Sequence, residues 1–262
     1  MTRHVTQLFD LHGKTALVTG GSRGLGFQMA QALGEAGARV MLAARKADEL
    51  EHAVMRLRDL GVDASWQATD CANEEQLQRL GQHALSELGH VDVLVNNAGA
   101  AWGAPAEDHP LEAWDKVMNL NVRGYFILSQ YVAKHCMIQR RQGSIINLAS
   151  IGGLGGNPPE IKTIAYNTSK GAVINFTRAL ATEWGRYGIR VNAVCPGFFP
   201  SKMTQGTLHA LGVDKLCEGV PLQRLGDDED LKGITLLFAS EAGKHITGQW
   251  LAVDGGVSVI AG

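Results

Sequence analysis

The chain has 262 residues, of which 45% are hydrophobic and 19% charged, a composition typical of a globular protein rather than a disordered or fibrous one. Lysine and arginine total 24 against 26 aspartates and glutamates, so the net charge of -2 provides no basic field for a nucleic acid backbone. The 4 cysteines lack a C-x-x-C pair and the 9 histidines lack ligand spacing, which predicts no disulfide framework and no metal site.

Short apolar runs alternate with amphipathic stretches along most of the chain. The apolar runs are predicted strands at residues 15–19, 39–43, 64–68, 91–95, 144–148, 190–194 and 250–253. The amphipathic stretches are predicted helices at residues 27–36, 48–60, 74–88, 111–138, 164–184 and 231–239. Helical crossovers between successive strands predict an α/β fold with a doubly wound parallel sheet of about seven strands, covered by helices on both faces. No repeat or polar linker divides the chain, so residues 1–262 are predicted to form one domain, with an N-terminal extension at 1–12.

The first predicted strand leads into a glycine-rich turn, T-G-G-S-R-G-L-G at residues 19–26, directly before a helix. In such a unit Gly20 permits the turn, Gly24 lets a pyrophosphate approach the helix N-terminus, and Gly26 lets the helix pack on the strand. The Lys-Ser/Thr pair of a P-loop is missing. The turn therefore predicts a dinucleotide site, and a purely structural turn is the alternative.

The end of the second predicted strand, Ala44-Arg45, is where an acidic residue would bind the ribose hydroxyls of NAD. This position holds no carboxylate that would repel a 2′-phosphate, and the planar, permanently charged group of Arg45 can bind such a phosphate. Arg23, in the glycine turn, adds a second positive charge. The pattern predicts a preference for NADP(H) over NAD(H); the alternative is that both arginines are solvated surface residues.

Further motifs follow in chain order: Asn96-Asn97-Ala98-Gly99 after the fourth strand, Tyr166-Asn167-Thr168-Ser169-Lys170 in a helix, and Pro196-Gly197 after the sixth strand. With the glycine turn, they resemble the single-domain short-chain dehydrogenases/reductases over about residues 13–256. The resemblance implies a Rossmann-type fold, a homotetramer (dimer of dimers) and an oxidoreductase that interconverts ketones and secondary alcohols by hydride transfer. The Ala44-Arg45 pattern makes NADP(H) the preferred cofactor, with NAD(H) possible.

The candidate catalytic residues are Asn121, Ser150, Tyr166 and Lys170. Tyr166 and Lys170 are four apart on a predicted helix, so they lie on one face. The resemblance makes Tyr166 the general acid/base, and the Lys170 ammonium and an oxidised nicotinamide should both favour its phenolate. Ser150, at the carboxyl edge of the sheet, would hydrogen-bond the substrate oxygen. Asn121 matches the family's asparagine better than Asn119 does, and would bind a water that links Lys170 to solvent. Taken singly, these residues could also be an ordinary helix pair, a strand-end serine and an asparagine that satisfies backbone groups.

The same resemblance assigns residues to parts of the cofactor. Asp70 and Cys71 would lie beside the adenine, Asn96 to Gly99 would support the central strand and border the adenosine ribose, Lys170 would hold the nicotinamide ribose, and Ser201 would reach the carboxamide. The predicted cofactor-binding residues are Gly20, Ser22, Arg23, Gly24, Leu25, Gly26, Arg45, Asp70, Cys71, Asn97, Ala98, Gly99, Tyr166, Lys170, Pro196, Gly197 and Ser201.

The substrate side is less closely defined. Residues 198–220 resemble the lid of the family, and the segment between Ser150 and Tyr166 is longer than in the 3-oxoacyl-carrier reductases. The runs AYNTSKGAVINFTRALA and VCPGFFPSKMT resemble gluconate 5-dehydrogenase-like members, whose substrates are sugar acids. Lys162 and Lys202 are candidates to meet a substrate carboxylate, or are simply solvated lysines.

Three other functions remain open: a 3-oxoacyl-carrier-protein or thioester reductase, a non-catalytic dinucleotide sensor, and a sugar epimerase or dehydratase, although the last usually has a larger C-terminal substrate domain. The first residues lack the apolar run of a signal peptide, and no stretch reaches the roughly 20 apolar residues that span a bilayer. We therefore expect a soluble cytoplasmic protein whose partners are small carbonyl or alcohol substrates, with no membrane or nucleic acid partner.

Overall fold

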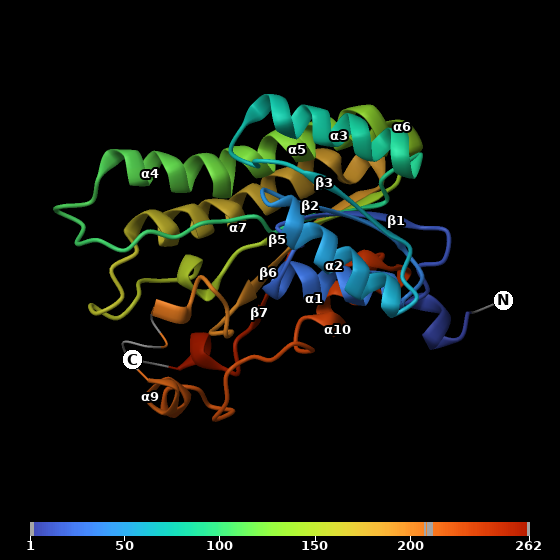
Figure 1. Cartoon of the computed structure of the whole chain (residues 1–262). Coiled ribbons are helices and arrows are strands. Elements are labelled where there is room, and N and C mark those ends of the chain that lie inside the picture. The colour runs from blue at the N-terminus through green and yellow to red at the C-terminus, as the bar shows by residue number, and fades with distance from the viewer. Residues whose placement is uncertain (1–2, 207, 209–211, 261–262) are drawn as a thin grey trace.

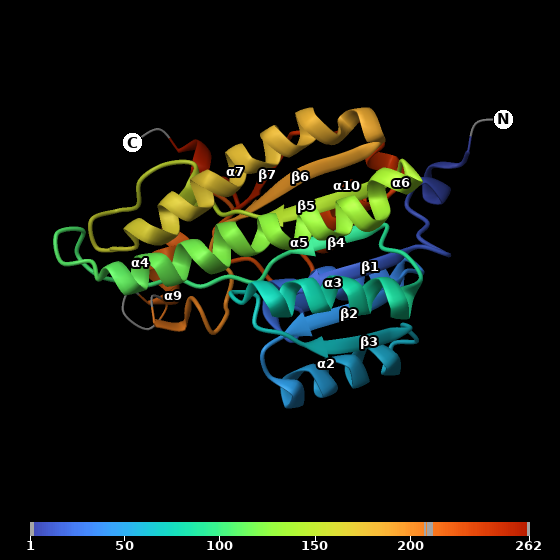
Figure 2. The same cartoon turned by 90° about the horizontal axis from the view of Figure 1, so that it is seen from above.

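A computed structural model describes residues 3–206, 208 and 212–260 of the chain. Its centre is a single parallel sheet with the strand order β3-β2-β1-β4-β5-β6-β7 (Figures 1 and 2). The strands are β1 Thr15–Thr19, β2 Arg39–Ala44, β3 Ala64–Ala68, β4 Val93–Asn96, β5 Gly143–Leu148, β6 Ile189–Pro196 and β7 Trp250–Val253. The predicted doubly wound Rossmann-type fold is confirmed.

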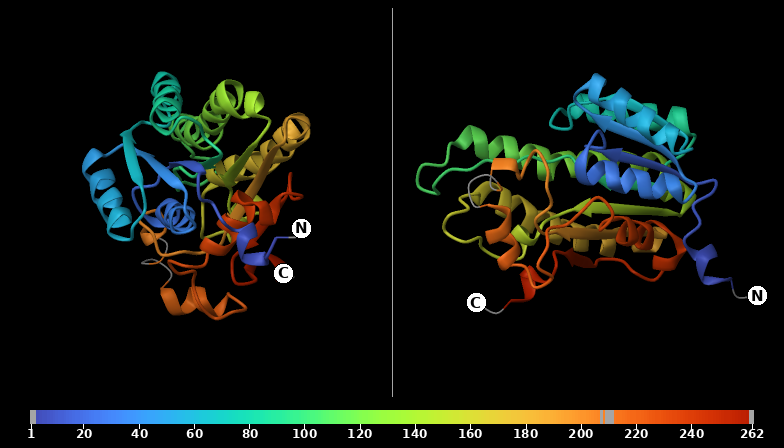
Figure 3. Two further views of the ribbon diagram at one scale, coloured as in Figure 1. Left: turned by 90° about the vertical axis from the view of Figure 1, so that its right-hand side faces the viewer. Right: turned by 60° about the horizontal axis from the view of Figure 1, so that its bottom comes forward.

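Helices cover both faces of this sheet, as the left view of Figure 3 shows along the strands. The helices are α1 Gly24–Glu35, α2 Ala47–Asp59, α3 Glu74–Leu88, α4 Leu111–Met118, α5 Gly124–Val132, α6 Ile138–Arg140, α7 Ile164–Trp184, α9 Val213–Glu218 and α10 Lys232–Ala239. Short 3-10 turns occupy Val5–Leu8, Ile151–Gly153, Gly185–Tyr187, Glu241–Gly243 and Val257–Val259.

Side chains of the inner strands point alternately to the two faces of the sheet and pack in separate buried cores. In β1, Ala16 and Val18 pack in the core that contains residues of α1, α2 and α10. Leu17 packs in the core that contains residues of α3, α5 and α7. Strands that bury both faces are apolar throughout rather than alternating, which explains the continuous TALVT run of β1.

Most predicted elements are found within one or two residues of their expected bounds, but the predicted single helix at 111–138 is wrong in detail. Two π-helical segments, Asn119–Arg123 and Ala133–Met137, interrupt it between α4, α5 and α6. A π turn adds one residue to the helical repeat, which an apolar periodicity of 3.6 does not reveal. Helix α9 was not predicted, and within the described residues no helix has the length and apolarity needed to cross a membrane.

The strand order places the candidate site. From β1 the strand order continues through β2 to β3 on one side of the sheet, and from β4 it continues through β5 and β6 to β7 on the other side. In such sheets ligands bind at the carboxyl ends of the strands, at the point where the order reverses. The glycine turn follows β1, the N-N-A-G motif overlaps the end of β4, and Ser150 follows β5. The predicted lid at 198–220 is described only in part, since residues 207 and 209–211 lie outside the described residues, as do residues 1–2 of the predicted N-terminal extension.

Candidate functional site

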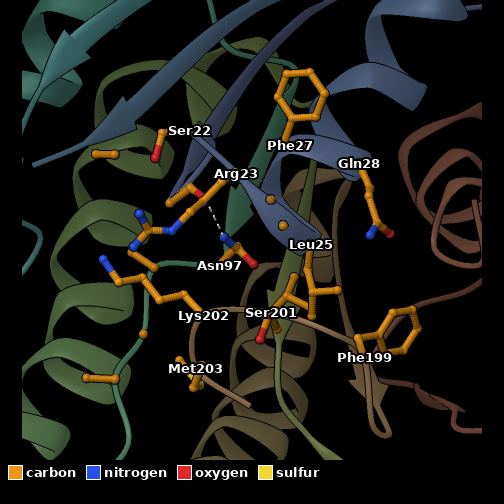
Figure 4. Close-up of a pocket in the computed structure, with 18 of the residues that line it drawn as sticks. Ser22, Arg23, Leu25, Phe27, Gln28, Asn97, Phe199, Ser201, Lys202 and Met203 are labelled. Atoms are coloured by element: carbon orange, nitrogen blue, oxygen red, sulfur yellow. Dashed lines mark hydrogen bonds between the residues drawn. The ribbon is translucent and has the colours of Figure 1, made fainter. Parts of the chain in front are cut away.

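A cavity of about 690 Å³ opens at the carboxyl edge of the sheet (Figure 4). Its volume lies within the range of small-molecule and cofactor pockets. All the predicted cofactor-binding residues line it, as do three of the four candidate catalytic residues, Ser150, Tyr166 and Lys170. The fourth, Asn121, is fully buried and lies outside the lining. Residues separated by up to 208 positions in the sequence, from Gly20 to Asp228, therefore share one pocket.

The glycine turn adopts a shape that requires glycine at specific positions. Gly20 has a φ of +64°, and a Cβ on it would lie 2.5 Å from Nδ2 of Asn97. A Cβ on Gly26 would lie 2.4 Å from the Gly20 carbonyl oxygen, so the third glycine mainly lets the turn close on itself. Gly24, the first residue of α1, faces open space. The N-terminus of a twelve-residue helix is thus open to the pocket, an arrangement that suits an anionic phosphate.

The two asparagines after β4 have different surroundings. Nδ2 of Asn97 donates hydrogen bonds to the carbonyls of Thr19 and Gly20, at 2.9 and 3.0 Å, and so fixes the glycine turn against β4. Asn96 turns into the core, where its Nδ2 donates to Ser129 and Asn147. Asn96 therefore supports the sheet, as predicted, but does not border the pocket.

The part of the pocket between the glycine turn and α2 contains a carboxylate that the sequence did not reveal. Nη1 of Arg23 lies 2.7 Å from Oε2 of Glu49, and Nζ of Lys46 lies 3.0 Å from its Oε1. The hydrogen bond from Lys46, together with the charges of Arg23 and Lys46, lowers the pKa of Glu49 against a smaller opposing effect of burial. Arg45 also lines the pocket. The end of β2 itself holds no carboxylate, as expected, but α2 begins beside β2 and directs Glu49 into the same pocket.

Lys170 lies in the interior, on the first turns of α7. Its Nζ donates to the carbonyl oxygen of Leu148 at 2.5 Å and lies 5.6 Å from the centre of the Tyr166 ring and 5.7 Å from that of Tyr125. The side chain is 4% exposed, and burial lowers its pKa to about 8. Lys170 therefore remains an ammonium at neutral pH, but it loses its proton more easily than an ordinary lysine.

Tyr166 and Ser150 meet at the same end of the pocket. Burial raises the pKa of Tyr166 above its ordinary value, while the Ser150 hydroxyl opposes this rise. The expected lowering of the tyrosine pKa by Lys170 is therefore not found, because loss of solvent around the phenolate is the larger effect. Oγ of Ser150 accepts a hydrogen bond from the Gly152 N–H at 3.1 Å, so this serine also caps a turn while its own hydroxyl proton stays available.

Asn121 connects the loop after β4 to helix α7. Its Oδ1 accepts from the Ala100 N–H at 2.8 Å, and its Nδ2 donates to the Ala100 carbonyl and to Oγ of Ser169. Both amide hydrogens are used by protein groups. A water bound here would therefore have to donate to an oxygen of Asn121.

The long segment between Ser150 and Tyr166 connects two lining residues, but none of its residues 151–165, all of which the structure describes, lines the cavity. Nδ2 of Asn157 donates to Oγ1 of Thr163 and to Oδ1 of Asn167, at 2.9 and 3.0 Å, and Thr163 also donates to Asn167 at 2.8 Å. This network attaches the segment to the residue that follows Tyr166. The Lys162 carbonyl accepts from the Ala104 N–H, which connects the segment to the loop after β4.

The two lysines suggested for a substrate carboxylate lie in different places. Lys202 lines the pocket, and in Figure 4 its side chain extends toward the same part of it as that of Arg23. Lys162 is exposed and does not line it. Several other lining residues were also not predicted as site residues: Lys46, Glu49, Thr69, Leu148, Phe199, Met203 and Thr204. Thr69 and Phe199 follow the ends of strands, which is a sequence signal for a place in the pocket. Glu49 has no such signal, because its place in the pocket depends on how α2 packs.

Comparisons with known proteins agree with this geometry. Residues 14–211 match the family model for short chain dehydrogenase. The chain is 37% identical over 253 residues to gluconate 5-dehydrogenase of Gluconobacter oxydans, covering 96% of this chain and 97% of the relative. It is 39% identical over 258 residues to a rhamnolipid-biosynthesis 3-oxoacyl-[acyl-carrier-protein] reductase of Pseudomonas aeruginosa, covering 95% and 97%.

A solved structure resembles the chain over nearly its whole length. It is a gluconate 5-dehydrogenase of Burkholderia cenocepacia in complex with NADP and tartrate, with a TM-score of 0.92, 34% identity, and coverage of 98% of this chain and 100% of that one. The fold, the geometry of the site and the sequence therefore all indicate the same family. The chain belongs to the short-chain dehydrogenase family and is an oxidoreductase that acts on CH–OH groups with NAD(P).

Proposed function

We propose that this protein interconverts a ketone and a secondary alcohol with NADP(H), and that Tyr166 is its general acid/base. The observation that supports this most strongly is the convergence of Ser150, Tyr166 and Lys170 in one pocket with the glycine turn. A dinucleotide sensor needs the glycine turn but not the other three residues. The fold alone does not decide function, because one fold can carry many activities.

The residues present fit a dinucleotide that carries a 2′-phosphate. The open N-terminus of α1 at Gly24 suits the pyrophosphate, and Arg23 and Arg45 line the end where a 2′-phosphate would lie. Cys71, whose pKa burial raises to about 12, is a neutral group for an adenine to lie against. Once bound, the nicotinamide supplies or accepts the hydride.

The residues of the chain itself supply the proton and hold the substrate oxygen. Because its pKa is raised, Tyr166 is a neutral phenol at neutral pH and can donate its proton to the carbonyl oxygen during reduction. The Ser150 hydroxyl is placed to hydrogen-bond the same oxygen. Lys170 would bind the nicotinamide ribose and favour the phenolate left after proton transfer, which in oxidation accepts the alcohol proton.

A sugar acid is the substrate class that we favour. The gluconate 5-dehydrogenase relatives match over nearly the whole chain, and the solved structure among them is a complex with NADP and tartrate, a hydroxy acid. The second candidate is a 3-oxoacyl thioester, supported by the 39% identity to a 3-oxoacyl-[acyl-carrier-protein] reductase and by the apolar side chains of Phe199 and Met203 in the lining.

The test is NADPH consumption with 5-ketogluconate, an acetoacetyl thioester and a simple ketone, repeated with NADH. We expect the highest kcat/KM with the keto acid and NADPH. A higher kcat/KM with the thioester than with the keto acid would contradict the sugar-acid assignment and favour the 3-oxoacyl thioester. Failure of every carbonyl and alcohol tested, with tight NADPH binding, would contradict the enzymatic function and favour a sensor. Equal kcat/KM values with NADPH and NADH, or kcat/KM values that Arg45→Ala leaves unchanged, would contradict the cofactor preference.

A further inference from the structure

Glu49 is the one acidic residue in contact with the cations in the part of the described pocket between the glycine turn and α2. It lies in the first turn of α2, and its side chain is 25% exposed. It bridges Arg23 and Lys46, and Oγ of Ser22 lies 3.4 Å from its Oε2. Arg23 and Ser22 come from the glycine turn, so the bridge joins two separate elements of the predicted cofactor site.

The bridge uses cations that a 2′-phosphate would also need. Arg45 has no ion pair with any residue that the structure describes, whereas Arg23 and Lys46 are both paired with Glu49. The side chains of Arg23 and Lys46 are 51% and 59% exposed, and ion pairs as exposed as these are weak and exchange readily. A phosphate dianion offers a guanidinium a stronger, bidentate partner than one carboxylate oxygen does.

The carboxylate remains in the pocket after such an exchange. Glu49 then faces a second anion at short range, which opposes the binding of a 2′-phosphate. An unphosphorylated ribose requires no exchange, and a carboxylate oxygen can accept hydrogen bonds from its hydroxyls. Glu49 therefore opposes the binding of NADP(H) and supports the binding of NAD(H).

We propose that Glu49 is a specificity-determining residue that limits the preference of this enzyme for NADP(H) over NAD(H). It holds Arg23 and Lys46 in place and competes with the 2′-phosphate for them. The inference rests on the proposed NADP(H) preference and adds the residue that sets its size.

The test compares Glu49→Gln with Glu51→Gln, which removes the same charge from an exposed position of α2 that does not line the pocket. Dissociation constants are measured without substrate, by the fluorescence of NADPH and NADH and by calorimetry with 2′,5′-ADP and 5′-AMP. For Glu49→Gln we expect NADPH and 2′,5′-ADP to bind about two- to fivefold more tightly, the upper part of the range that exposed ion pairs reach. NADH and 5′-AMP should bind unchanged or more weakly, and Glu51→Gln should resemble the wild type.

Two results would overturn the inference, and they differ from failure of the proposed cofactor preference. Either Glu49→Gln shifts the NADPH-to-NADH ratio no more than Glu51→Gln does, or it weakens NADPH binding, which would mean that Glu49 only positions the arginine. If the wild type itself binds 2′,5′-ADP no better than 5′-AMP, the preference for NADP(H) fails first.

Discussion

Replacement of Lys170 by methionine should change how the stability of the protein depends on pH. Methionine keeps the length of the buried stem and removes the ammonium. Burial lowers the pKa of Lys170 from its ordinary 10.5 to about 8. At about 1.4 kcal/mol per pKa unit, the buried ammonium destabilises the folded state by about 3 kcal/mol relative to a solvated lysine.

The sign of the pH dependence follows from proton binding. Between about pH 8 and 10.5, Lys170 binds fewer protons in the folded protein than in the unfolded chain, so wild-type stability rises with pH across this window. The free energy of unfolding of the wild type minus that of Lys170→Met should therefore increase by about 2 kcal/mol from about pH 7 to 9.5. Loss of the hydrogen bond to the Leu148 carbonyl adds an offset of about 1–3 kcal/mol that does not depend on pH.

Urea unfolding followed by tryptophan fluorescence, at one fixed protein concentration, measures this difference. Lys162→Met, which removes an exposed lysine that does not line the pocket, is the matched control and should give a difference that stays constant with pH. If the wild-type and Lys170→Met curves stay parallel over the same range, the buried ammonium does not carry the desolvation penalty argued here.

Three further predictions concern binding and assembly. Lys202→Ala should raise the dissociation constant of NADPH about two- to fivefold and the KM of the carbonyl substrate less, because its side chain extends toward the part of the pocket that Arg23 reaches. A larger effect on KM than on NADPH binding would indicate that Lys202 contacts the substrate instead. Asn157→Ala should loosen the segment between Ser150 and Tyr166, which Asn157 attaches to Asn167 beside Tyr166, and raise the KM of the substrate about three- to tenfold while NADPH binding, measured by fluorescence, stays the same. Equal losses in both would contradict a role on the substrate side. Light scattering should give four times the 28.1 kDa of one chain, in line with the family resemblance and with Trp250 and Leu251, which are 38% and 49% exposed on β7; a monomer at micromolar concentration would refute this.

Much of this architecture could be predicted because its signals are local. The bounds of β1 and α7 follow from unbroken apolar or amphipathic runs, and the spacing of four between Tyr166 and Lys170 places them on one helix face whatever the rest of the chain does. The glycine turn is equally local, since its positive φ at Gly20 is a property of a few residues.

The parts that could not be predicted depend on how distant elements pack. Glu49 reads as an ordinary helix residue until α2 is placed beside the glycine turn. The rise in the pKa of Tyr166 depends on burial that the motif does not specify. The π turn around Asn121 differs from a regular helix by one residue, which is too small a change for a periodicity to detect.

The central claim is that Tyr166 transfers the proton. The most direct measurement is the kcat of Tyr166→Phe with the best carbonyl substrate, together with the dissociation constant of NADPH for the same variant. Removal of one hydroxyl should lower kcat by about 10²-fold or more and leave NADPH binding within about twofold, because a positioned acid/base contributes in this range. A variant that turns over at the wild-type rate would contradict the account, and so would one that loses activity only because it no longer binds NADPH.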